Sequence, residues 1–121
     1  MNGEPSVEAL KALRAALRTF TTERDWDQFH SPKNLAMALS VEAAELLEVF
    51  QWVSEVDSRA LGPAAKAAAS EEIADVLLYL ILLCDELDID PVAAAERKMI
   101  ANALKYPVDK ARGTSKKYTE L

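Results

Sequence analysis

Two pairs of acidic residues have the types and the spacing to do chemistry. Glu42 and Glu45 form one pair, and Glu72 and Asp75 form the other, in stretches rich in alanine and leucine. Residues three positions apart share one face of a helix, so each pair would present two carboxylates together. Carboxylate oxygens are the ligands that hard cations such as Mg²⁺ or Mn²⁺ prefer. The spacing therefore predicts a metal site built from two helices.

The direction of these carboxylates separates them from ordinary surface acids. On a helical wheel, apolar residues fall within about 40° of Glu42 and of Glu72, whereas Glu45 and Asp75 lie at the stripe edges. The flanking residues are Leu35, Leu46, Val49 and Val53 for Glu42, and Val76, Tyr79 and Leu83 for Glu72. Inward carboxylates without basic neighbours repel one another and are costly to bury, so they need cations.

Two other interpretations of these acids compete with a metal site. Solvated helix acids are the first, and Glu48, Glu55, Glu71 and Glu86 fit that description. A di-iron bundle is the second, but it needs Glu-x-x-His pairs from two helices. The single histidine of the chain, His30, lies in an expected loop outside any such motif.

The elements that would position the acids are four helices. Periodicity and start and stop signals predict helices over 7–22 (with Ser6 as N-cap), 32–54, 64–87 and 91–104, and a loop over 55–63. Helices of this length with short links predict an all-α four-helix bundle. The length of 121 residues fits a single domain, 1–121, with a basic C-terminal tail over 105–121.

Composition and charge restrict the partners. A formal net charge of −6 argues against duplex nucleic acid, although divalent ions can bridge an acidic protein to polyphosphate. A lone cysteine, Cys84, and the absence of a signal-like N-terminus indicate a cytoplasmic protein. The apolar run 76–84 is shorter than the roughly 18 residues that span a bilayer, so no membrane partner is expected.

Strings beyond the acids resemble a known family. The pattern resembles the all-α nucleoside triphosphate pyrophosphohydrolase (MazG-like) superfamily, and much of the chain from Glu23 onward is similar to its dCTP pyrophosphatase branch. The matching strings include Glu23-Arg24-Asp25-Trp26, Gln28-Phe29-His30, Phe50-Gln51-Trp52, Lys98-Met99, Tyr106-Pro107-Val108 and Lys117-Tyr118-Thr119.

The resemblance implies an activity and a set of site residues. The activity would be Mg²⁺-dependent hydrolysis of a nucleoside triphosphate to the monophosphate and pyrophosphate, with dCTP or a related or modified pyrimidine deoxynucleotide as substrate. The four acids would bind the metal, Trp26 and Trp52 would line the base pocket, and Tyr79, Lys98 and Asn102 would hold the nucleotide. The resemblance also implies a homotetramer. The alternatives are a broad NTP or dUTP pyrophosphatase and a non-catalytic helical interaction module.

Further residues bear on this interpretation. Lys98 and Asn102 share a helix face, with Tyr106 near the same line, and suit phosphate and sugar oxygens; a solvated lysine is the alternative for Lys98. The basic tail either folds over a phosphate or is mobile. Leu17 stands where vertebrate dCTP enzymes carry a histidine, which leaves the base preference open.

Apolar residues surround the third expected helix on nearly every side. Leu77, Leu78 and Ile81 are expected to point away from the acids. Because one small bundle has a single interior, this surface predicts association with further copies of the chain.

Overall fold

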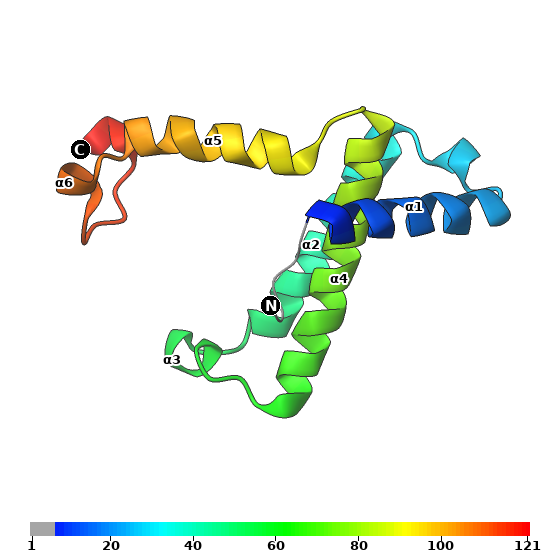
Figure 1. Cartoon of the computed structure of the whole chain (residues 1–121). Helices are drawn as coiled ribbons and strands as arrows, with labels where there is room; N and C mark the ends of the chain where they lie inside the picture. Colours follow the sequence, from blue (N-terminus) through cyan, green and yellow to red (C-terminus); the bar gives the residue numbers. More distant parts are fainter. Residues whose placement is uncertain (1–6) are drawn as a thin grey trace. The chain divides into compact units, whose positions relative to one another are not determined.

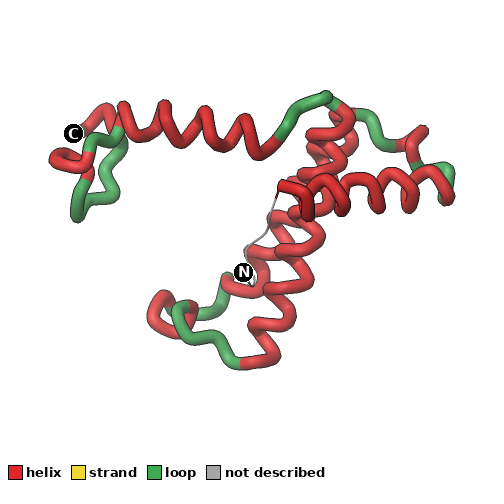
Figure 2. The backbone as a smooth tube through the Cα atoms, in the orientation of Figure 1, coloured by secondary structure: helices red, strands yellow, loops and turns green. Residues whose placement is uncertain are grey.

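The computed structural model describes residues 7–121, and its regular structure is helical throughout (Figures 1 and 2). No strand occurs within these described residues, which confirms the all-α prediction. The elements are α1 (Val7–Glu23), η1 (Asp27–Phe29), α2 (Pro32–Phe50), α3 (Glu55–Ser58), α4 (Pro63–Glu86), α5 (Pro91–Lys105), α6 (Val108–Ala111) and η2 (Tyr118–Glu120). None of the helices in this part of the chain has the length and apolar character needed to cross a bilayer.

The chain divides into two compact units. The first is Met1–Asp88 and contains α1 to α4, and the second is Ile89–Leu121 and contains α5, α6 and η2. The single domain over 1–121 and the four-helix bundle therefore stay predictions.

The first unit is organised around the pair of α2 and α4. These two helices run side by side in opposite directions, and α1 lies across α4 (Figure 1). Its core is small: Leu35 from α2, with Ala69 and Ile81 from α4, are the buried apolar side chains among the described residues. The pairing of α2 with α4 is what brings the two acidic pairs to one place.

Local capping explains where the main helices begin. The Ser31 hydroxyl accepts a hydrogen bond from the Asn34 N–H, and Pro32 occupies the first turn of α2. At the start of α5, the Asp90 carboxylate accepts from the N–H groups of Val92 and Ala93. Both starts agree with the sequence-based prediction. The expected Ser6 cap of α1 lies outside the described residues.

The end of the second helix was predicted wrongly. We expected this helix to continue to about residue 54, but α2 ends at Phe50. The Ser54 hydroxyl instead accepts a hydrogen bond from the Asp57 N–H and caps the short helix α3, inside the segment expected to be a loop. Val53 and Trp52 consequently lie in the turn between the two helices, and the helical-wheel position given to Val53 does not apply.

The apolar surface of α4 also differs from expectation. Ile81 is 5% exposed and belongs to the core, and Leu78 lines a cavity within the first unit. The reason is that α4 packs against both α1 and α2, so its own chain covers more of its surface than one partner helix would. Large apolar side chains that remain exposed on α4 form a stripe of Ile73, Leu77 and Leu80.

In the second unit, the tail returns to the end of α5. Gly113 has a φ of +78° at the turn, a backbone conformation that glycine adopts readily. The Tyr118 ring then packs edge-on against Tyr106 at 5.9 Å between centroids. The Lys105 ammonium lies 4.8 Å from the centroid of the same Tyr118 ring. The tail thus packs against the end of α5 in its own unit, and a role over phosphate stays a prediction.

Candidate active site

Three of the four predicted acids meet between α2 and α4. One carboxylate oxygen from each of Glu42, Glu45 and Glu72 lies within 4.8 Å of the others. Glu42 and Glu72 are half-buried, whereas Glu45 is exposed at the edge. Three carboxylates at this distance repel one another when they are ionised.

Two oxygens in this acid cluster have no hydrogen-bond partner. Oε2 of Glu42 and Oε2 of Glu72 are buried and unpartnered. The ion pairs between described residues are Lys11–Glu8, Arg18–Asp85 and Arg59–Glu55, so no basic side chain neutralises the cluster. A buried carboxylate oxygen left without a donor or a cation is costly. The cluster therefore offers ligand oxygens to a divalent cation. It lacks the positive charge that such a cation would supply.

The titration of these acids reflects their crowding. Burial is the main cause that raises the pKa of Glu42, followed by its hydrogen bond with Glu45 and by repulsion from Glu45, Asp75 and Glu72. Burial is also the main cause for the raised pKa of Glu72, with repulsion from Glu45 next. Both causes disfavour the ionised form, and a bound cation would favour it.

Asp75 joins the acid cluster to a neighbouring cavity. Its carboxylate lies outside the triplet of closest oxygens, yet its charge raises the pKa of both Glu42 and Glu72. It is exposed and lines a cavity of about 250 Å³ within the first unit. A molecule in this cavity would thus lie next to the acids.

The cavity is mostly apolar and aromatic. Its walls come from α1, from the loop before α2 and from α4. The lining residues are Leu17, Phe20, Thr21, Trp26, His30, Asp75, Leu78, Tyr79 and Leu82. Aromatic walls with few polar groups suit the flat faces of a nucleobase. Trp26 and Tyr79 were predicted from the sequence, and the structure places both here.

A tight turn at the end of α1 fixes Trp26. Asp25 has a φ of +55°. The backbone N–H of Trp26 then donates a hydrogen bond to the Thr21 carbonyl at 2.9 Å. The Gln28 amide donates to the Asp25 carbonyl and carboxylate, at 3.0 Å each, which supports this left-handed residue. This turn consequently holds the Trp26 ring at the cavity wall, against Phe20 of α1.

Neighbouring rings complete this aromatic wall. Trp26 packs edge-on against Phe20 at 5.7 Å and against His30 at 6.4 Å between centroids. The Arg24 guanidinium lies over the Phe20 ring, 3.6 Å from its centroid. Sequence reasoning missed Phe20 and left out His30. The sequence signal for Phe20 was its position: it is an aromatic residue in the last turn of the helix that precedes Trp26.

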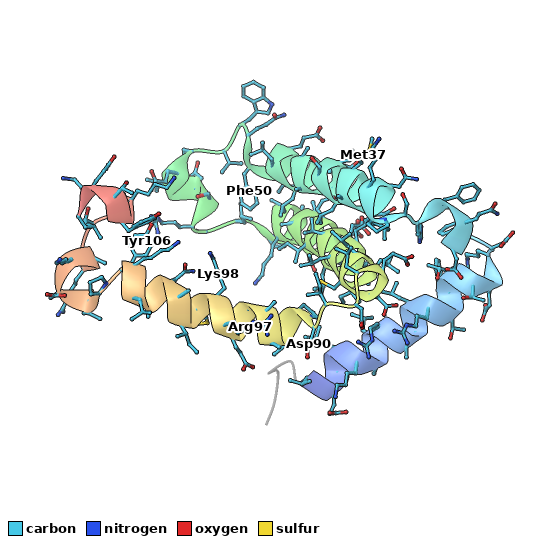
Figure 3. The ribbon with its side chains drawn as sticks, turned by 90° about the horizontal axis from the view of Figure 1, so that it is seen from above. Met37, Phe50, Asp90, Arg97, Lys98 and Tyr106 are labelled. Carbon is cyan, nitrogen blue, oxygen red and sulfur yellow. The ribbon has the colours of Figure 1, made fainter. Side chains whose placement is uncertain are left out.

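The other predicted substrate-binding residues lie elsewhere. Trp52 is 89% exposed in the turn after α2. It is not among the residues that line the cavity. Lys98, Asn102 and Tyr106 belong to the second unit, at α5 and its end (Figure 3). Lys98 and Asn102 are exposed, and Tyr106 is half-buried against Tyr118. Their roles toward a nucleotide stay predictions.

Comparison with known proteins gives concordant matches. The model of the MazG-like family matches residues 37–121. The chain is 43% identical over 120 residues to "dCTP pyrophosphatase 1" of Rattus norvegicus and of Homo sapiens, covering 98% of this chain and 69% of theirs.

A solved structure agrees with these relatives. The crystal structure of a pyrophosphatase from Archaeoglobus fulgidus DSM 4304 superposes with a TM-score of 0.78 at 42% sequence identity, covering 88% of this chain and 98% of that one. The match to the family model includes all four acids and continues through both units. These findings confirm the resemblance predicted from the sequence: the chain belongs to the MazG-like family.

Proposed function

We propose that this protein is a Mg²⁺-dependent nucleoside triphosphate pyrophosphohydrolase, which cleaves between the α- and β-phosphates. Its substrate would be dCTP or a related or modified pyrimidine deoxynucleotide. The observation that carries the proposal is the pair of buried, unpartnered oxygens of Glu42 and Glu72 beside Glu45. The relatives named dCTP pyrophosphatase 1 support the choice of substrate.

Glu42, Glu45, Glu72 and Asp75 would hold the metal. Their oxygens suit Mg²⁺, with Mn²⁺ as a substitute. The raised pKa values of Glu42 and Glu72 reflect the absence of a positive charge near these carboxylates. When bound, the metal neutralises phosphate charge and lowers the pKa of a coordinated water. Glu45 is the exposed member of the cluster and is the group that we expect to accept a proton from the attacking water.

The aromatic cavity would take the base. Trp26 and Tyr79 line it together with Asp75, whose carboxylate adjoins the acid cluster. A base held against these rings would leave its phosphates on the side of the acids. This placement would turn a bimolecular reaction into one between oriented groups. Lys98, Asn102 and Tyr106 would add contacts to phosphate and sugar, a role that is supported by the family resemblance.

Assembly into a homotetramer belongs to the same proposal. Ile73, Leu77 and Leu80 form an exposed apolar stripe on α4, which a neighbouring copy of the chain would bury. Trp52 is almost fully exposed in its own chain, where a base or a neighbouring copy could cover it. We expect neighbouring chains to complete the base pocket, with Trp52 as a contributor.

One observation favours a second candidate function. Leu17 contributes a side chain without hydrogen-bonding atoms to the cavity. The loss of one hydrogen-bonding side chain from a lining that keeps Thr21, His30 and Tyr79 would weaken discrimination among bases. A broad NTP or dUTP pyrophosphatase is therefore the alternative within the same chemistry.

A panel of nucleotides tests the proposal. Each canonical dNTP, dUTP and several 5-substituted dCTP analogues would be incubated with the protein and Mg²⁺, and monophosphate and pyrophosphate would be quantified. The proposal predicts pyrophosphate from pyrimidine substrates at the highest kcat/KM. Equal kcat/KM across the panel would favour the broad enzyme, and no hydrolysis would contradict both.

A further inference from the structure

We propose that the Arg18–Asp85 ion pair is a positioning device that holds the α1 wall of the aromatic cavity against α4 and so sets nucleotide affinity. This inference rests on the proposed function, because it assigns the cavity to the nucleobase. Arg18 and Asp85 are not part of the lining of that cavity. They would act on the nucleotide through the residues that are.

The ion pair joins two helices at short range. Nε of Arg18 donates to Oδ2 of Asp85 at 2.7 Å, and Nη2 donates to Oδ1, which makes the contact bidentate. The Asp85 side chain is 18% exposed and the Arg18 side chain 59%. The hydrogen bond from Arg18 lowers the pKa of Asp85 even though burial acts in the opposite direction. Bidentate geometry at a half-buried carboxylate makes this pair stronger than an exposed one.

The positions of the two residues place the ion pair next to the cavity wall. Arg18 lies between Leu17 and Thr21 in sequence, and both of those line the cavity. Asp85 follows Leu82, another lining residue, by three positions on α4. A shift of α1 along or away from α4 would therefore move the wall and break the ion pair at the same time.

A second cavity shares part of this wall, and the ion pair lies beside it. It has a volume of about 340 Å³ and includes Arg18 and Asp85 in its lining. Thr21, His30 and Leu82 line both cavities, so they form a partition between them. Thr21 is buried in this partition, but a cavity on each side leaves the α1–α4 contact with fewer packing neighbours than a filled core would give. The ion pair spans this space from α1 to α4.

The rings attached to α1 would transmit any movement. Phe20 lies on α1 and packs against the Trp26 ring. The backbone N–H of Trp26 donates a hydrogen bond to the Thr21 carbonyl. Loosening α1 would thus displace the aromatic face that meets the base, while the acids on α2 and α4 would stay in place. The expected kinetic consequence is a raised KM with little change in kcat.

A double-mutant cycle tests the proposal. Arg18→Met keeps the length of the side chain and removes the ion pair, and Asp85→Asn removes it from the other side. We expect each variant to raise KM by about 10-fold with kcat within about twofold, and the double variant to be no worse than either alone. Lys11→Met is the matched control, because Lys11 forms an exposed pair with Glu8 on the same helix. Its KM should equal that of the wild type.

Further variants and a second readout separate positioning from mere stability. Arg18→Lys keeps the charge without the planar fork, so its KM should be raised above that of wild type but by less than about 10-fold. This variant keeps the proposal testable if Arg18→Met does not fold. In a Trp52→Phe background Trp26 is the single tryptophan, and its quenching by acrylamide should increase when Arg18 is replaced.

Unchanged KM and unchanged quenching in folded Arg18→Met would overturn the proposal, as would independent, multiplying effects of the two substitutions. Increased quenching in a protein that hydrolyses no nucleotide would instead contradict the proposed function and keep the positioning role.

Discussion

Glu42 on α2 and Glu72 on α4 each bury one carboxylate oxygen without a partner, on the two sides of a single cluster. Neighbouring acids and burial together raise the pKa of both residues. Burying carboxylates that repel one another lowers the stability of the metal-free folded state. A bound divalent cation would offset this cost, which is why the arrangement supports the proposed metal chemistry.

Removing single acids should abolish turnover while leaving the fold intact. Glu42→Gln, Glu45→Gln, Glu72→Gln and Asp75→Asn should each lower kcat at least ~100-fold, as expected when a preorganised electrostatic contribution is lost. Steady-state kinetics at saturating Mg²⁺ is the measurement. Glu48→Gln and Glu71→Gln are matched controls on the same helices, because both side chains are exposed. Near-normal turnover in the Glu45 and Asp75 variants would argue against their place in the metal site.

The metal-free protein should gain stability as the pH falls from neutral. A carboxyl with a raised pKa in the folded state binds its proton more tightly there than in the unfolded chain. For Glu42 and Glu72, the stabilising contribution is therefore complete below the ordinary carboxyl range and is lost as pH rises through the raised pKa. Thermal unfolding of metal-free wild type and of Glu72→Gln across this range is the measurement.

The Glu72→Gln variant should be more stable than wild type at neutral pH without metal and should show a flatter pH dependence. Mg²⁺ should stabilise wild type more than the variant at neutral pH. Asp85 acts in the opposite sense, because its lowered pKa gives stability that is lost as pH falls through that value. A Glu72→Gln variant less stable than wild type at neutral pH would contradict the described cluster.

The two tryptophans should contribute to binding in different ways. Trp26→Ala should raise KM by an amount equivalent to about 1 to 3 kcal/mol of lost stacking, since the ring lines the cavity of its own chain. Trp52→Ala should have a comparable effect in the assembled protein, where a neighbouring copy would place it at a pocket. Nucleotide titration of both variants with matched Phe substitutions measures this. Unchanged affinity in Trp26→Ala would remove the cavity from the base site.

Assembly should depend on the exposed stripe of α4. Leu77→Glu or Leu80→Glu should break the oligomer and lower activity with it, because each places a charge within an apolar contact. Light scattering with activity on the same samples is the measurement. Ala67→Glu is the control, an exposed position on a different face of α4. A fully active monomer of the wild type at micromolar concentration would contradict both the tetramer and the shared pocket.

Much of the fold was predictable because its signals are local. Ser31-Pro32 and Asp90-Pro91 combine a capping side chain with a proline, and both begin helices as predicted. The convergence of Glu42 and Glu72 was also predictable, since a carboxylate within an apolar stripe must face another element. The end of α2 was not, because Ser54 could continue one helix or cap the next, and local sequence does not decide between them.

The cavity depends on tertiary placement, and this explains what the sequence did not reveal. Leu78 and Ile81 were assigned to an outer surface, but α1 and α2 both pack on α4 and cover more of it. The Phe20–Trp26 contact depends on the left-handed backbone of Asp25, which turns the chain back at the end of α1. Neither feature follows from a helical wheel.

The identity of the products distinguishes cleavage between the α- and β-phosphates from cleavage at the terminal phosphate. A ³¹P NMR time course of dCTP with the protein and Mg²⁺ would follow each phosphorus signal as the substrate disappears. Cleavage between the α- and β-phosphates predicts pyrophosphate and dCMP in equal amounts, with no reaction in Glu72→Gln. Orthophosphate with dCDP, or full activity in the presence of excess chelator, would contradict the account.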